Sequence, residues 1–340
     1  MSQQPAKSCP AFDTLGSGVQ RRDFLRMTGA LAMSALLPYS LRADADSAAL
    51  DSYVGELYKS LSADQKKVLC FPYDHPLRTK AQANWNITEP SIDSLETVQQ
   101  DLVEKIVRGL SSEEGFEKFM TQMGDDHGGM GSYHIALFGD PAMKDGKCQF
   151  VLTGRHATMR ADAYNNDGVA FSGPMVYGHA SMGFNEKADH PGNVFWYQAK
   201  RANEVFAALD SNQRAKAMGK QAPEESSIEL RTSGYDGLPV AEMTPDQKNL
   251  VKAVMADLLN PYSKAQVDEV MHIIADNGGM DKINLAFYKQ DSAGKNIDIG
   301  DDSVWDVWRL EGPGFVWHFR GAPHVHTWVN IAKVNPSENS

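Results

Sequence analysis

Three short segments recur in the same order towards the two ends of the chain, and this recurrence is the strongest constraint on its fold. The first pair shares a helix start, the second a Gly-Gly-Met turn before an apolar strand, and the third a Phe-Val strand followed by arginine and histidine. The pairs are residues 61–67 with 243–249, 128–138 with 278–287, and 150–156 with 315–324. They predict two similar halves, about 50–165 and 243–333. Because the spacings differ, chance similarity between helix starts and strand ends remains the alternative.

Hydrophobic spacing predicts an α+β domain in which helices flank an antiparallel sheet. Apolar residues recur at helical intervals in several stretches, and short apolar runs typical of strands separate them. A segment rich in Gly, Asn and Asp, 162–193, is expected to be largely loop, and 218–240 reads as polar and irregular. Helices are expected near residues 50–61, 95–110, 113–123, 195–209, 244–259 and 263–276, and strands near 133–139, 149–155, 283–289, 304–310, 314–319 and 324–332.

The first 45 residues have the pattern of a twin-arginine signal peptide. Arg21-Arg22 is followed by Phe24-Leu25 and by a small apolar run over 27–37. That run is too short to cross a bilayer, which requires about 20 apolar residues, but it suits a signal peptide. Ala43-Asp44-Ala45 offers a cleavage site. We therefore expect residues 46–340 to form a single domain that works in the periplasm or elsewhere outside the cytoplasm; a buried N-terminal helix with two chance arginines is the alternative.

The charge balance excludes some classes of partner. The chain has 33 basic and 44 acidic residues, a net charge of −11, and removal of the arginine-containing signal would make it more acidic. Such a chain lacks the basic face that nucleic acid or anionic lipid needs. No later stretch is apolar enough for stable membrane insertion. The expected partners are the twin-arginine export machinery and a small-molecule substrate.

Two cysteines, Cys70 and Cys148, would remain after cleavage of the signal. They could form a disulfide in an oxidising compartment. Both lie in apolar surroundings, so two buried free thiols are an equal alternative. A metal site built on cysteine is not expected, because the sequence contains no Cys-x-x-Cys pair.

The sharpest chemical motif is His324-Val325-His326, which lies in a predicted strand. Side chains alternate along a strand, so both imidazoles project from the same face. Together with a third ligand they could hold one transition metal ion. The alternative is a pair of histidines that hydrogen-bond within the sheet or lie exposed at its edge.

The candidate third ligands are His156 and His179. Each follows a Gly-containing turn where the backbone can approach a cavity closely. His127 and His134 flank another glycine cluster, and Asp125 and Asp126 could serve a metal or orient its ligands. Arg155, beside His156, is a candidate stabiliser of an anion or oxygen intermediate. For each lone histidine a structural role is the alternative.

The imidazole-rich ligand set suits copper, zinc or iron. The expected metal is copper or iron, with zinc less expected. Twin-arginine export adds modest support, since that route carries proteins that take up a cofactor before they cross. Motifs of other enzyme classes are absent: the sequence has no Gly-x-Ser-x-Gly, no phosphate-binding glycine loop and no His-Glu-x-x-His. Four tryptophans in the C-terminal part are expected to belong to the core rather than to a ligand platform: Trp305, Trp308, Trp317 and Trp328.

Several segments resemble domain-of-unknown-function family 3500. The resemblance rests on residues 305–313 and 324–327 for the end of that family, and on 154–156 and 171–174 for its middle section. In the family a Gly-His-His element usually precedes a Phe-x-Pro turn. This chain has Arg155 at the first histidine position, so only His156 carries over. The resemblance covers most of the chain after the signal. It supports His156, His324 and His326 as candidate site residues, but it implies no reaction.

The leading functional hypothesis is an extracytoplasmic copper or iron oxidoreductase with His324 and His326 as ligands and with His156 and His179 as ligands or supporting groups. The alternatives are a non-catalytic module that binds a small molecule or a cell-envelope glycan, and a metal-independent hydrolase with a histidine base.

Overall fold

The computed structural model describes residues 40–143, 146–162, 168–179, 194–294 and 305–334, with side chains from Leu50 onward. The chain divides into two compact units after Arg42, and the description below concerns the unit 43–340. The paired arginines and the apolar run of the predicted signal lie outside the described residues, so the export prediction stays a prediction. In the parts described, none of the helices combines the length and apolar character that a bilayer crossing requires.

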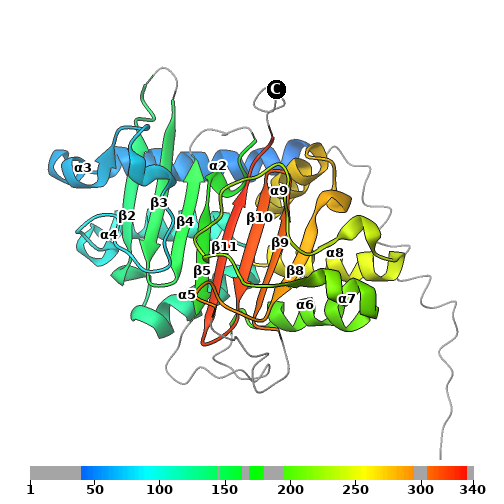
Figure 1. The fold of residues 1–340 in the computed structure, drawn as a ribbon. Coiled ribbons are helices and arrows are strands. Elements are labelled where there is room, and N and C mark those ends of the chain that lie inside the picture. Colours follow the sequence, from blue (N-terminus) through cyan, green and yellow to red (C-terminus); the bar gives the residue numbers. More distant parts are fainter. Residues whose placement is uncertain (1–39, 144–145, 163–167, 180–193, 295–304, 335–340) are drawn as a thin grey trace, which may run out of the picture. The chain divides into compact units, whose positions relative to one another are not determined.

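One sheet of eleven strands organises the domain, which confirms the predicted α+β class. Its order is β1-β2-β3-β4-β5-β11-β10-β9-β8-β6, with β7 paired to β8 (Figure 1). Neighbours are antiparallel apart from the parallel pairs β1–β2 and β6–β8. The strands are β1 (Cys70–Phe71), β2 (His134–Gly139), β3 (Cys148–Gly154), β4 (Ala157–Asp162), β5 (Met175–His179), β6 (Met218–Gly219), β7 (Leu238–Pro239), β8 (Asn284–Tyr288), β9 (Val307–Gly312), β10 (Phe315–Arg320) and β11 (Val325–Ile331).

The described residues contain eight α-helices: six lie at the expected places, and two short ones, α3 and α7, were not expected. Amphipathic spacing places their apolar residues on one side of each helix. The helices are α2 (Ser40–Ser60), α3 (Ala63–Leu69), α4 (Thr97–Leu110), α5 (Glu113–His127), α6 (Tyr197–Ala208), α7 (Ser211–Ala217), α8 (Pro245–Leu259) and α9 (Lys264–Asp276). Short 3-10 helices lie at Pro76–Thr79, Ile92–Ser94, Met130–Ser132, Ala170–Ser172, Val240–Glu242 and Met280–Lys282.

The two faces of the sheet are covered differently. Alternate strand residues such as Tyr177 and Val329 pack with the helices in one large core. The residues between them pack on the other face against chain segments without regular structure, as Trp328 does against Ile228. The four C-terminal tryptophans are buried, as expected for core residues. The second face also carries the polar side chains of the candidate site.

The order of elements is the same on both sides of the β5–β11 pair. On each side a short helix precedes an outer parallel strand, and a pair of longer helices precedes three antiparallel strands. In this order of elements α8 corresponds to α4 and not to α3. The position that corresponds to residues 243–249 is therefore the start of α4. A duplication of the two halves stays a prediction.

Paired glutamines hold the helix starts together on both sides. Gln65 of α3 and Gln99 of α4 exchange amide hydrogen bonds of 2.8 and 3.1 Å. Gln213 of α7 and Gln247 of α8 do the same at 2.9 and 2.8 Å. Each glutamine also accepts a hydrogen bond from the backbone N–H of the residue that caps its own helix.

The expectation that 162–193 is mainly loop is wrong for Met175–His179. These residues form β5, which pairs with β4 and with β11 near the middle of the sheet. The glycines and the proline around this strand masked its apolar character in the sequence. Residues 180–193 lie outside the described part of the chain.

Cys70 and Cys148 are free thiols. They lie on β1 and β3 with β2 between them. Two strand spacings separate their backbones by roughly 9–10 Å, beyond the Cα distance of about 7 Å that a disulfide can span. Burial raises the pKa of Cys148 to about 12, so this thiol is unreactive at neutral pH.

Replacement of Gln99 by Ala should reduce the free energy of unfolding by roughly 2 kcal/mol. The side chain is 1% exposed and binds the carbonyl of Ser60, the N–H of Glu96 and the amide of Gln65. The variant removes the hydrogen bonds to all three groups. Urea denaturation provides the measurement, with Asp101→Ala on the exposed side of α4 as control. A loss no greater than that of the control would contradict this role.

Candidate functional site

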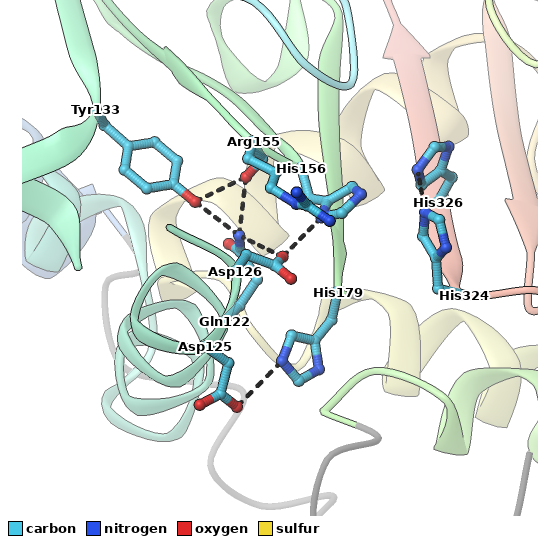
Figure 2. A network of polar contacts seen from close by, with 9 residues as sticks. All are labelled: Gln122, Asp125, Asp126, Tyr133, Arg155, His156, His179, His324 and His326. Carbon is cyan, nitrogen blue, oxygen red and sulfur yellow. Dashed lines mark hydrogen bonds and ion pairs between the residues drawn. The ribbon is translucent and has the colours of Figure 1, made fainter. Parts of the chain in front are cut away.

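Three histidines that are distant in the sequence meet on one face of the sheet. His156 lies in the turn between β3 and β4, His324 directly precedes β11, and His326 is the second residue of β11 (Figure 2). Potential ligand atoms of the three lie within 4.8 Å of one another. The Nε2 atoms of His324 and His326 are 3.0 Å apart. The structure therefore brings together three of the four histidines that the sequence singled out.

The backbone of His156 is held in an unusual conformation. Its φ is +54°, in a two-residue turn between the paired residues Gly154 and Ala157. The hairpin between β9 and β10 has a turn of the same length, but there the position is Gly314, with a φ of +61°. Glycine adopts this conformation without steric cost, whereas other residues lose about 1 kcal/mol or more. A histidine in this place indicates that its side chain is needed.

Gly178 makes room for the cluster. It lies opposite His326 in the pairing of β5 with β11. A Cβ atom there would lie 3.4 Å from the Cβ of His156 and 2.2 Å from the carbonyl oxygen of Val325. The absence of a side chain therefore allows β11 and the β3–β4 turn to approach each other.

Two carboxylates orient two of the three imidazoles. Nδ1 of His156 lies 2.6 Å from an oxygen of Asp126, and Nδ1 of His326 lies 2.8 Å from an oxygen of Glu225. An ionised carboxylate only accepts hydrogen bonds, so in each histidine Nδ1 carries the proton and donates it. The lone pair then resides on Nε2, the atom of each ring that remains for a metal. This arrangement is typical of histidine ligands in metal sites.

A buried polar network fixes the first of these carboxylates. The side chain of Asp126 is fully buried. The amide of Gln122 donates to Asp126 and to the carbonyl of Arg155, at 3.2 and 3.0 Å (Figure 2). The hydroxyl of Tyr133 donates to the same carbonyl at 2.7 Å. Helix α5 is thereby tied to the turn that carries His156.

The electrostatic surroundings keep the histidines of β11 neutral. Burial, helped by the neighbouring His326 and Arg320, lowers the pKa of His324 to about 3. Burial also lowers the pKa of His326. Burial alone would raise the pKa of Glu225, but the hydrogen bond from His326 and the charge of Arg320 outweigh it and lower that pKa to about 2. Neutral imidazoles are the form that binds metals.

The other two predicted site residues take different positions. His179, the last residue of β5, is fully buried, and its Nε2 lies 3.3 Å from a carboxylate oxygen of Asp125. It does not belong to the group of three. Arg155 has an exposed side chain and contributes its main-chain carbonyl to the network around Asp126. Their proposed roles as ligand and anion stabiliser stay predictions.

Glu225, Gln122 and Arg320 were not predicted from the sequence as parts of this site. Glu225 lies in the segment 218–240, which reads as irregular, and no spacing connects it with His326. Only the path of the chain across the second face of the sheet brings it there. Gln122 is one of several polar residues in α5, and its burial against Tyr133 could not be deduced from helical spacing.

The donor set fits a transition metal ion. Three imidazole nitrogens converge from two separate parts of the chain, and carboxylates orient two of the rings. Three protein ligands leave coordination positions free for water or a substrate, as in catalytic rather than structural metal sites. The nitrogen donors suit copper, iron or zinc, and exclude a preference for magnesium or calcium, which select oxygen.

Replacement of Glu225 by Gln should produce a stability loss that depends on pH. The lowered pKa of Glu225 means that its carboxylate stabilises the fold above pH 4.5, its ordinary value, and that this contribution is lost as the pH falls towards 2. We expect a difference in unfolding free energy of roughly 2 kcal/mol at pH 7, after allowance for partial solvent screening, that shrinks between pH 5 and 2. Urea denaturation in the presence of a chelator measures it. A difference that stays constant with pH would show that the charge of Glu225 is not involved.

Comparison with known proteins gives one match. No curated protein and no solved structure matches the chain. The model of the family described as "protein of unknown function (DUF3500)" matches residues 43–331, which is most of the sequence and includes all three clustered histidines. The chain belongs to the DUF3500 family.

Proposed function

We propose that this protein is an exported, metal-binding oxidoreductase that holds a copper or iron ion on His156, His324 and His326. One observation supports the proposal above all others: potential ligand atoms of the three lie within 4.8 Å, and the carboxylates of Asp126 and Glu225 orient two of the rings. The cost of the left-handed conformation at His156 points the same way.

The nature of the ligands favours copper or iron. Imidazole binds both metals well, and copper(II) has the highest affinity among the divalent ions of the first transition row. A bound ion of this kind would supply one-electron chemistry and a free coordination position for a small substrate. Zinc would fit the same donors, and it is the less favoured choice because it supplies no redox chemistry.

The residues of the chain would prepare the site for that ion. Asp126 and Glu225 fix which nitrogen of His156 and His326 carries a proton, so that the other nitrogen is ready to bind. Gln122 and Tyr133 hold the turn of His156 in place. Arg155, exposed beside that turn, would be available to an anionic substrate or intermediate, and His179 with Asp125 would support the site from β5.

The double variant His324→Ala, His326→Ala should lose the metal ion, because two of its three ligands are removed. The wild-type protein, exported by its own signal, is expected to contain close to one copper or iron ion per chain, and the variant only background amounts. Elemental mass spectrometry of the purified proteins measures this. His272→Ala provides a matched control, since His272 lies on α9 with a side chain 68% exposed.

Retention of a stoichiometric metal by the double variant would place the ion elsewhere. No metal in the wild-type protein, even after reconstitution with copper and with iron, would refute the metal site and favour the metal-free binding module or hydrolase. Stoichiometric zinc would retain the site but contradict one-electron chemistry at the metal ion.

The proposed location depends on the paired arginines of the N-terminal segment. Because the export receptor reads both, the double variant Arg21→Lys, Arg22→Lys should leave the protein in the cytoplasm despite its unchanged charge. Cell fractionation followed by immunoblotting measures the distribution, and Arg26→Lys serves as control. Undiminished export of the double variant would refute the twin-arginine route.

A further inference from the structure

Arg320 lies beside the histidine cluster, although nothing in the proposed function requires it. It is the last residue of β10 and pairs directly with His326 of β11. Side chains of residues opposed in this way share a face of the sheet, with Cβ atoms about 5 Å apart. Nη1 of Arg320 lies 2.8 Å from one oxygen of Glu225, and the other oxygen of Glu225 binds His326. One carboxylate thus holds both the arginine and a proposed ligand.

The opposite edge of this guanidinium has no acceptor. Nε and Nη2 of Arg320 are buried, and neither makes a hydrogen bond within the part of the chain that the structure describes. The N–H bonds of these two nitrogens point in the same direction, in the geometry that binds both oxygens of a carboxylate. Buried charged donors without an acceptor are destabilising, and each needs an explanation such as a ligand.

The charges around the cluster favour an anion of charge −1. The three histidines are counted as neutral ligands. A divalent ion and Arg320 contribute three positive charges, while Asp126 and Glu225 contribute two negative ones, which leaves a net charge of +1. Asp125 is not counted, because it is half exposed and faces His179. A singly charged ligand would therefore neutralise the site.

From these observations we infer that the substrate of this site is a small carboxylic acid, whose carboxylate binds the Nε–Nη2 edge of Arg320 beside the histidine cluster. The inference rests on the proposed function, which it extends by a substrate class and by a residue that recognises it. Arg320 is then the residue that determines specificity, and Glu225 positions it. The side chain of Arg320 is 20% exposed, but Nε and Nη2 are themselves buried, so a ligand reaches this edge only when the atoms that cover it move aside.

Acetate is a suitable probe for this inference. The exported protein is loaded with copper(II), and its electron paramagnetic resonance spectrum is followed during titration with sodium acetate. We expect a saturable change in the wild-type protein. In Arg320→Lys the affinity for acetate should fall about tenfold or more, because lysine keeps the charge and the pairing with Glu225 but lacks the two-pronged edge. Arg231→Lys is the matched control: Arg231 also pairs with a glutamate, Glu311, at 2.8 Å, and its replacement should leave the affinity unchanged.

Two further probes separate the possible outcomes. Acetamide, an uncharged analogue of acetate, should produce no change in the wild-type spectrum, and an equal response to acetamide and acetate would overturn the inference even if Arg320→Lys does not fold. Azide, which binds copper without needing the arginine edge, should affect the wild-type protein and Arg320→Lys equally. An azide response without an acetate response, or equal acetate affinities in wild type and Arg320→Lys, would overturn the inference and leave the metal site standing. Failure of the wild-type protein to take up copper or iron would remove the proposed function, and this inference with it.

Discussion

The pairing of β5 with β11 is the interaction on which the site depends. These strands join the two sides of the sheet, and their register places Gly178 opposite His326 and His179 opposite Val325. Val325 and Val329 are fully buried among the helices, so the alternation of side chains turns His326 to the other face. A shift of one residue would turn His326 towards the helices and the two valines to the opposite face. The hydrophobic core therefore fixes the direction in which the histidine points.

The same pairing sets the distance between the parts of the cluster. The β3–β4 turn carries His156 towards β11, and the lack of a side chain at Gly178 leaves the space between them free. The left-handed backbone of His156 and the burial of Asp126 both reduce stability, yet both contribute to the orientation of one imidazole. Such destabilising conformations and buried charges are concentrated at functional sites, where the packing of the surrounding structure holds them in place.

The two sides of the sheet share an element order, but only one of them carries a histidine in its hairpin turn. On the other side the equivalent position in the β9–β10 hairpin is Gly314, which follows Pro313 in a turn suited to both residues. The comparison of His156 with Gly314 distinguishes the backbone conformation that the turn requires from the side chain that the site requires. The β9–β10 hairpin needs only a residue that tolerates a positive φ, whereas the β3–β4 hairpin accepts strain to place a ring.

Much of the fold could be predicted from the sequence, because periodicity and capping are local properties. Helical spacing located α4, α5, α6, α8 and α9, and the alternation around His324 and His326 placed both imidazoles on one side of a strand. β5 was missed, since its glycines and the adjacent proline interrupt the apolar pattern by which strands are recognised. Three of the four histidines named as ligands meet in the structure, whereas His179 turns to the helical face.

Local patterns determined which residue types were available, and the tertiary structure decided which of them meet. The sequence by itself determined the α+β class, the His-x-His pair and the choice of His156 as a candidate ligand, because these follow from spacing within a few residues. Only the folded chain decided that Asp126 and Glu225 orient the rings and that Arg320 lies beside them. These contacts join residues that are far apart in the chain, and their positions follow from the sheet register and from the packing of irregular segments, which no local pattern encodes.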